Sequence, residues 1–302
     1  MGRGHHHHHA DPSEGDWKLA LAVLVNLGLT AAQVAGGILS GSLALIADAL
    51  HNLSDAMSLV IAFAARRIAR RPADAEMTFG YGRAEVVAAL INYTTLILLG
   101  LYLAYEAVLR LLDPEPVAGW TVVIVAGIAL AVDLATAALT YAQSRSSVNI
   151  RAAFLHNLAD AMGSVAVIAA GTLILLHDWR LVDPIVTLGI AGYILWMAFR
   201  EIGGVIRILM LGSPPEIETD AVLATARAVP GVAGVHHAHF WQMGEHEASL
   251  DLHVVVQDWG RAEAIRAEVK RRLREAHGIA HSTIEMERAG RDACEGAPLY
   301  GH

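Results

Sequence analysis

Six long apolar runs constrain the fold of this chain more than any other feature. Each run is about 20 residues long, which is the length that an α-helix needs to cross the hydrocarbon core of a bilayer. In lipid a single helix satisfies its backbone hydrogen bonds internally, so these runs predict six transmembrane helices. The runs cover Trp17–Leu39, Leu43–Ala65, Val86–Leu109, Trp120–Ala142, Phe154–Leu176 and Pro184–Ile206.

The composition supports a multi-pass membrane protein. Of the 302 residues, 55% are hydrophobic and only 17% are charged, which departs from the usage of soluble domains. Only Ser40-Gly41-Ser42 separates the first two runs, so we expect a membrane helix there and no cleaved secretory leader. The net charge of -8 leaves no basic surface for nucleic acid. The single cysteine, Cys294, cannot form an internal disulfide, which suits a reducing compartment.

Arginines predict the orientation in the membrane. They flank the second and fourth connections between the apolar runs, and cytoplasmic loops carry such an excess of basic residues. The arginines concerned are Arg66, Arg67, Arg70, Arg71, Arg83, Arg145 and Arg151. We therefore expect a protein of the cytoplasmic (inner) membrane with both termini in the cytoplasm.

The chain divides into four parts. Residues 1–16 are polar and contain His5 to His9, which form either an expression tag or a metal-gathering tail, and both interpretations stay open. Residues 17–212 form the transmembrane domain. Residues 213–290 form a polar domain, and we expect residues 291–302 to be a mobile end.

The polar domain has helix and strand patterns in the order αββαβ. Helical periodicity covers Glu216–Val229 and Arg261–Ala276, and alternation of apolar residues predicts strands at Val235–Met243, Ala248–Gln257 and Ala280–Glu287. This order predicts a small cytoplasmic α+β domain of ferredoxin-like type.

A heptapeptide in the second apolar run returns almost unchanged in the fifth. The two copies are His51-Asn52-Leu53-Ser54-Asp55-Ala56-Met57 and His156-Asn157-Leu158-Ala159-Asp160-Ala161-Met162. In each copy a His and an Asp are four residues apart and therefore share one helix face. Two such helices side by side would offer the tetrahedral set of nitrogen and oxygen ligands that zinc prefers. The intramembrane ligand set is thus His51, Asp55, His156 and Asp160.

The cost of burying these carboxylates favours a bound cation. An Asp at mid-bilayer costs about 2.5–3.5 kcal/mol on insertion scales, and a metal ion or protons would offset that cost in mutually exclusive ways. Hydrogen bonding between helices is the simpler account of a lone polar residue, but the duplication favours a metal site. For both copies to lie at one depth, the fifth helix must begin near Ser146, with Arg151 extending to the interface.

Other polar residues in the apolar runs are interpreted mainly as hydrogen-bond partners between helices. Asp48 lies one turn before His51 and is a candidate acceptor that would orient its imidazole. Asp133 is a candidate for lining a water path. The remaining ones are Asn26, Gln33, Asn92 and Glu106.

Taken together, these motifs resemble the cation diffusion facilitator family, in particular its zinc-exporting branch, over nearly the whole chain. Further motifs of the resemblance are Arg71-Pro72-Ala73-Asp74 leading to Phe79-Gly80-Tyr81-Gly82-Arg83-Ala84-Glu85, and Val235-His236-His237-Ala238-His239-Phe240-Trp241. The resemblance implies that the intramembrane ligand set is the transport site of a homodimer. Such a protein exchanges cytoplasmic zinc for external protons by alternating access, and Co²⁺ and Cd²⁺ remain open as further substrates.

The resemblance also implies a regulatory zinc site in the polar domain. The matching positions are His236, His253 and Glu287, here called the tail ligand set. Additional candidate ligands are His237, His239, His281 and Glu285. Some relatives carry another site in the loop after the second span, with histidines where this chain has Met77 and Tyr81. With only Asp74 and Glu76 nearby, we expect that site to be absent.

Two functions of other classes were weighed against transport. An intramembrane zinc hydrolase would use the same ligand types, but the sequence has no His-Glu-x-x-His pattern, and four protein ligands leave no position for water. A membrane-anchored metal sensor would not need two costly intramembrane Asp residues. We therefore expect a transporter and not an enzyme.

Overall fold

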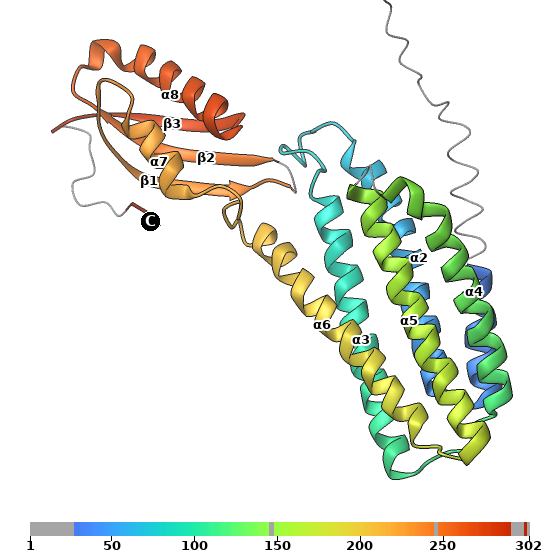
Figure 1. Cartoon of the computed structure of the whole chain (residues 1–302). Helices are drawn as coiled ribbons and strands as arrows, with labels where there is room; N and C mark the ends of the chain where they lie inside the picture. Colours follow the sequence, from blue (N-terminus) through green and yellow to red (C-terminus); the bar gives the residue numbers. More distant parts are fainter. Residues whose placement is uncertain (1–26, 145–147, 245–246, 291–298, 301–302) are drawn as a thin grey trace, which may run out of the picture. The chain divides into compact units, whose positions relative to one another are not determined.

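The computed structural model describes residues 27–144, 148–244, 247–290 and 299–300. The described chain forms two compact units (Figure 1). The first unit contains the residues up to Ile61 together with Asn92–Arg200. The second contains Ala62–Ile91 and Glu201–His302.

Long apolar helices make up the membrane part. After a helix at Leu27–Ser40 come α2 (Leu43–Ala69), α3 (Ala84–Leu112), α4 (Gly119–Ser144), α5 (Val148–His177) and α6 (Val182–Leu209). Within the described residues, these last five helices are long and apolar enough to cross a membrane. The expected first span began at Trp17, and its residues 17–26 lie outside the described residues. The helical membrane domain is thus confirmed.

Helix α2 lies at the centre of the first unit. One side of it packs Leu43 and Ala47 against α3 and α6, and the other packs Ala44 and Leu45 against α4 and α5. Small side chains at these contacts allow the close approach that lipid-embedded helices need, because lipid supplies no hydrophobic drive between them. Residues on α2 are therefore within reach of both helix pairs.

The start of α2 is held by a carboxylate from another helix. Asp183, at the start of α6, is 1% exposed and accepts hydrogen bonds from the Ser42 hydroxyl and from the Leu43 N–H, the latter at 2.8 Å. A negative charge there satisfies free N–H groups and opposes the helix dipole. Gly41 lies just before α2 and has φ 72. A Cβ at this position would lie only 2.8 Å from the carbonyl oxygen of Pro116, so a glycine is needed there. These contacts fix the depth and direction of α2.

The second unit contains the expected αββαβ domain. Its elements are α7 (Thr219–Arg227), β1 (Val232–Gln242), β2 (Ala248–Val256), a short 3-10 turn (Trp259–Arg261), α8 (Ala262–His277) and β3 (His281–Arg288). The sheet order is β1-β2-β3, with β1 antiparallel and β3 parallel to β2. Helix α8 makes the crossover between the two parallel strands, as the ferredoxin-like prediction requires.

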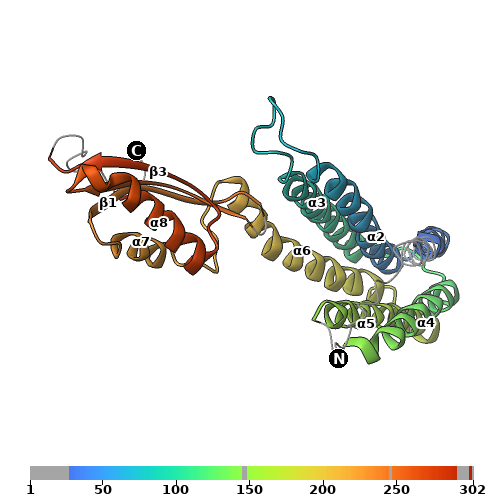
Figure 2. The ribbon, with the colours of Figure 1, turned by 90° about the horizontal axis from the view of Figure 1, so that it is seen from above.

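Both helices of this domain cover the same face of the sheet (Figure 2). Leu223 of α7 and Val269 of α8 share one core with Leu252 of β2. Because side chains alternate along a strand, His253 and Asp251 lie on the opposite face. That second face carries the candidate metal ligands of the domain.

Candidate metal centres

The intramembrane ligand set forms a closed ring between α2 and α5. His51 Nε2 lies 3.7 Å from Asp55 Oδ2 and 3.4 Å from Asp160 Oδ1. His156 Nε2 lies 3.3 Å from Asp55 Oδ2 and 3.4 Å from Asp160 Oδ2. Each imidazole nitrogen therefore faces one carboxylate of its own helix and one of the other helix. The structure brings together all four residues that the duplicated heptapeptide singled out.

The distances between neighbours around the ring match those of a tetrahedral zinc site, and ligand atoms of His51, Asp55 and Asp160 all lie within 4.8 Å of one another. Zinc binds His nitrogen and carboxylate oxygen at about 2.0–2.2 Å, so neighbouring ligand atoms of such a tetrahedron are about 3.3–3.6 Å apart. The N···O distances around the ring run from 3.3 to 3.7 Å. Asp55 Oδ2 and Asp160 Oδ1 are also buried without a hydrogen-bond partner. A divalent cation would supply that missing partner.

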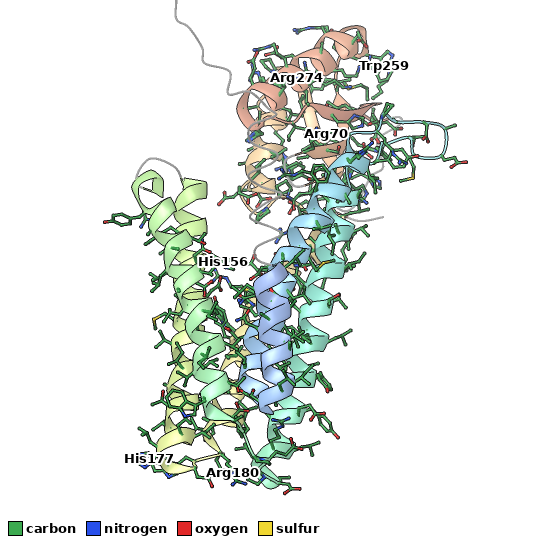
Figure 3. The ribbon with its side chains drawn as sticks, turned by 90° about the vertical axis from the view of Figure 1, so that its right-hand side faces the viewer. Arg70, His156, His177, Arg180, Trp259 and Arg274 are labelled. Carbon is green, nitrogen blue, oxygen red and sulfur yellow. The ribbon has the colours of Figure 1, made fainter. Side chains whose placement is uncertain are left out.

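Exposure differs between the two sides of the ring. The His51 and Asp160 side chains are 8% and 9% exposed, whereas those of Asp55 and His156 are 26% and 45% exposed. Asp55 and His156 lie one turn nearer to the C-terminal end of α2 and the N-terminal end of α5. In Figure 3, His156 lies far from His177, which marks the other end of α5. The ring is thus open toward the end of the unit where α4 connects to α5.

Two neighbours of His51 depend on tertiary packing. Tyr193 of α6 presents its ring at 84° to the imidazole, with the ring centroids 6.2 Å apart, and no spacing in the sequence indicated this contact. Asp48 accepts a hydrogen bond of 2.8 Å from the Gln33 side-chain amide. His51 Nδ1 is buried without a hydrogen-bond partner. Support of His51 by Asp48 therefore stays a prediction.

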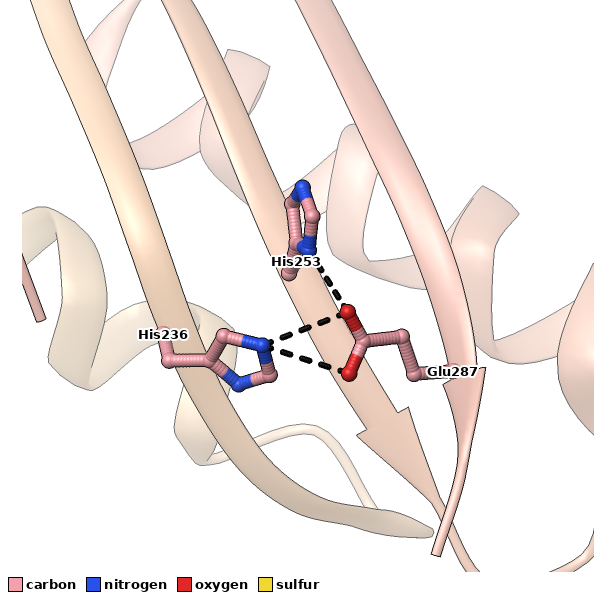
Figure 4. Close-up of side chains that lie close together, drawn as sticks. All are labelled: His236, His253 and Glu287. Atoms are coloured by element: carbon pink, nitrogen blue, oxygen red, sulfur yellow. Dashed lines mark hydrogen bonds and ion pairs between the residues drawn. The ribbon is translucent and has the colours of Figure 1, made fainter. Parts of the chain in front are cut away.

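The tail ligand set lies together on the open face of the sheet (Figure 4). Glu287 is 4% exposed. One of its carboxylate oxygens lies 2.6 Å from His253 Nδ1, and both lie 3.2 Å from His236 Nε2. Three ligand atoms from three different strands thus converge on one point.

A bulge in β1 brings another histidine to this set. The strand pairing runs from His236 opposite His253 to His239 opposite Asp251, so β1 contains one extra residue. The bulge includes His237, which has φ 48. A bulge changes the direction in which side chains leave the strand. The His237 ring centroid lies 4.6 Å from that of His253.

Of the other additional candidates, two lie near the tail ligand set and one lies far from it. The His239 ring centroid lies 4.9 Å from that of His237, and Glu285 Oε2 lies 3.4 Å from His253 Nε2. His281 is exposed and begins β3. At about 3.3 Å per residue, it lies about 20 Å along the strand from Glu287. The structure therefore places His237, His239 and Glu285 around the tail ligand set, and His281 apart from it.

The loop after α2 uses Asp74 for its own structure. Asp74 accepts hydrogen bonds from the Tyr81 hydroxyl at 2.7 Å and from the Met77 and Glu76 N–H groups at 2.8 and 2.9 Å. The Tyr81 bond is the main cause that holds the pKa of Asp74 below its ordinary value, and the Met77 N–H adds to it. Its carboxylate is therefore occupied in holding the turn. The absence of a metal site in this loop stays a prediction.

Two family models and several curated relatives match this chain. The cation efflux transmembrane domain matches residues 19–210, and the cation efflux protein cytoplasmic domain matches residues 214–289. Zinc transporter ZitB of Pectobacterium atrosepticum is 37% identical over 284 residues, which cover 93% of this chain and 88% of the relative. Metal cation efflux system protein CzcD of Cupriavidus metallidurans is 35% identical over 100% of this chain and 94% of its own length. A cadmium, cobalt and zinc/H(+)-K(+) antiporter of Bacillus subtilis is 35% identical over 94% of this chain and 92% of its own length.

Proposed function

The chain belongs to the cation efflux family, and we propose that it exports zinc from the cytoplasm in exchange for protons through the intramembrane ligand set. Efflux of divalent metal cations by a multi-pass membrane protein is the function of this family. The observation that carries the finer proposal is the closed ring, in which two imidazoles and two carboxylates alternate at 3.3–3.7 Å.

Competition at the ring couples zinc to protons. A neutral imidazole and an ionised carboxylate bind zinc, whereas a protonated imidazole does not. Zinc therefore loads at near-neutral pH and leaves toward a more acidic side. The greater exposure of Asp55 and His156 supports loading from the end of the helices where the arginines predict the cytoplasm. Rocking of the helices around the ring would then expose it to the other side.

The metal selectivity follows from the ligand types. Imidazole with carboxylate suits zinc and other borderline metals. Similar proteins are named as carriers of zinc, or of cadmium, cobalt and zinc. We propose zinc as the principal substrate, with Co²⁺ and Cd²⁺ as further substrates.

The second domain supports a dimer with a regulatory zinc site. Its matching family model is named for dimerisation, and the tail ligand set offers three converging ligand atoms. We propose a homodimer in the cytoplasmic membrane with both termini in the cytoplasm, where the tail ligand set would read the zinc concentration.

The hydrolase and sensor alternatives receive less support. The ring supplies four protein ligands, so a tetrahedral zinc ion there has no open position at which water could be activated. A sensor anchored in the membrane would not need the paired ligands of α2 and α5. Both matched regions belong to efflux proteins and together cover most of the chain.

Zinc flux in proteoliposomes tests the proposal. Asp160→Asn and His51→Ala each remove one member of the ring, so zinc uptake driven by a pH gradient should fall by at least about tenfold. Asp113→Asn is the matched control, because it alters an exposed carboxylate in the connection after α3 and should leave the flux unchanged. Normal flux in both ring variants would contradict the proposed transport site.

A further inference from the structure

A second polar layer lies beside the ring in the first unit. Its five side chains come from four helices and are at most 9% exposed: Gln33, Asp48, Asn52, Asp133 and Ser164. Polar groups in membrane spans are costly unless they are paired or functional. None of these five belongs to the intramembrane ligand set.

On one side of the layer, an amide links two residues of α2. The Gln33 side-chain N–H donates to Asp48 Oδ2 at 2.8 Å, and the Gln33 side-chain oxygen accepts from the Asn52 amide at 3.2 Å. Because Asp48 and Asn52 are four residues apart, they share one face of α2. This face is turned toward the helix that contains Gln33.

On the other side, the layer reaches α5. The Ser164 hydroxyl donates to Asp133 Oδ2 at 3.3 Å. A Cβ on the neighbouring Gly163 would lie 3.2 Å from Asp48 Oδ1, so the missing side chain makes room for the Asp48 carboxyl group. Asp48 of α2 and Asp133 of α4 thus border the same turn of α5, one turn beyond Asp160.

The charges that act on these two carboxyl groups are mostly negative. Asp48 is within electrostatic range of Asp133 of α4, Asp160 of α5 and His51 of its own helix, and Asp133 is within range of Asp160 and His156 of α5. Of the ion pairs found in the described part of the chain, none includes Asp48 or Asp133. An ionised carboxylate in such a place costs about 2.5–3.5 kcal/mol or more, and a bound proton removes that cost.

The hydrogen-bond directions do not provide the oxygen cage that an alkali cation needs. Sodium and potassium need several oxygen ligands directed at one point, as hard cations do. Gln33 instead directs its N–H group at Asp48 and uses its oxygen for Asn52. The layer therefore offers carboxyl oxygens that can take up a proton, and no cage of oxygen ligands.

We propose that Asp48 and Asp133 bind protons that are exchanged for the metal ion, so that the proton site extends beyond the metal ligands. This inference rests on the proposed zinc/proton exchange. A divalent cation in the ring repels protons on the adjacent layer and expels them, and the negative ring left after the metal departs attracts them again. The hydrogen bonds of both carboxyl groups go to Gln33 and Ser164, so the layer can release protons without breaking the ring.

The test measures zinc and protons together. Proteoliposomes that contain the full-length protein, with one dye for zinc and one for pH, give the number of protons moved per zinc ion. Asp48→Asn and Asp133→Asn keep the shape of each side chain but cannot take up or release a proton at neutral pH. Each should lower the proton-to-zinc ratio and reduce pH-driven uptake by at least about tenfold. Because zinc and these protons exclude each other, each variant should also make zinc binding at the ring less dependent on pH.

Controls separate proton binding from structural damage. Ser58→Ala removes a partly buried hydrogen bond of α2, the one from Ser58 to Asn92 at 2.7 Å, and should leave the ratio unchanged. Asp48→Glu and Asp133→Glu keep a carboxyl group and should retain part of the exchange. An unchanged ratio in both Asn variants would overturn the inference. Absence of any zinc flux in the unaltered protein would instead overturn the proposed function.

A second measurement decides the matter if the Asn variants do not fold. Infrared difference spectra of the unaltered protein, with isotope-labelled Asp, report protonated carboxyl groups directly. Addition of zinc should reduce the band of protonated Asp, because the metal charge expels the protons. A band that does not change when zinc binds would overturn the inference.

Discussion

Aspartate serves different purposes in this chain, and its surroundings decide which. Asp160 has an oxygen buried without a partner and faces two imidazoles, as a metal ligand would. Asp183 accepts the first N–H groups of α2, and Asp74 closes a turn. Asp133 accepts a hydrogen bond from the Ser164 hydroxyl. A residue type alone therefore does not predict its role, whereas its donors and acceptors do.

Glu287 is the residue on which the tail site most depends. Its buried carboxylate contacts both tail histidines, so Glu287→Gln should weaken zinc binding there by at least about tenfold, because the charged ligand is lost at constant size. The measurement is a zinc titration of full-length protein that also carries His51→Ala and Asp160→Asn.

Glu285→Gln is the matched control for this change. Its side chain is 66% exposed and lies 3.4 Å from the outer nitrogen, Nε2, of His253. It should have a clearly smaller effect on zinc binding. Equal effects of the two variants would contradict the central place of Glu287.

At the scale of elements, α8 combines a buried stripe with a charged outer face. Ile265, Val269 and Leu273 enter the domain core. On the outer face, Arg271 and then Arg272 hydrogen bond to Glu268 and lower its pKa from the ordinary value of 4.5 to about 2. These residues are three and four apart, the spacing at which helix side chains meet.

This pKa gives the sign of a pH effect on α8. Because the pKa is lower in the folded state, the ionised carboxylate stabilises the helix above pH 4.5, and the contribution is lost as the pH falls toward 2. Glu268→Gln should therefore speed hydrogen exchange of α8 amides at neutral pH, with a smaller difference from the parent protein at low pH. Salt should reduce the effect, because the pairs are exposed.

Glu263→Gln is the comparison for that experiment, because Glu263 also lies on α8 and forms an ion pair with Arg266. Its effect on exchange should be smaller than that of Glu268→Gln. A pH-independent difference for Glu268→Gln would contradict the assigned ion pairs.

Element boundaries illustrate what hydrophobicity misses. The apolar run predicted a fifth span from Phe154, whereas α5 begins at Val148. Backbone hydrogen bonds continue a helix through polar residues once it has begun, so the apolar run marks only the part in lipid. The earlier start agrees with the one that the two motifs required to lie at one depth.

For the whole molecule, zinc should stabilise the protein in a pH-dependent way. A ligand that binds only the folded state adds about 2.7 kcal/mol at a hundred times its dissociation constant. Protons compete for imidazoles whose ordinary pKa is about 6.5, so the zinc-induced rise in Tm should be larger at pH 7.5 than at about pH 5.5. Thermal unfolding of the full-length protein at both pH values measures it.

Two variants show how much of the zinc-induced stabilisation comes from the intramembrane ligand set and how much from the tail ligand set. Asp160→Asn should remove the part that comes from the membrane helices, and Glu287→Gln the part that comes from the tail domain. A zinc effect of equal size at both pH values would contradict the competition between metal and protons.

The sequence by itself determined the apolar spans, the paired His and Asp of each motif, and the αββαβ order of the tail. These features are local, because they depend on residues at most one span apart. Only the tertiary structure decided that His51 meets Asp160, that Asp48 pairs with Gln33, and that a bulge turns His237 toward His253 while His281 stays apart. Those contacts join residues that are distant in the chain or shifted in register, and packing between elements sets them.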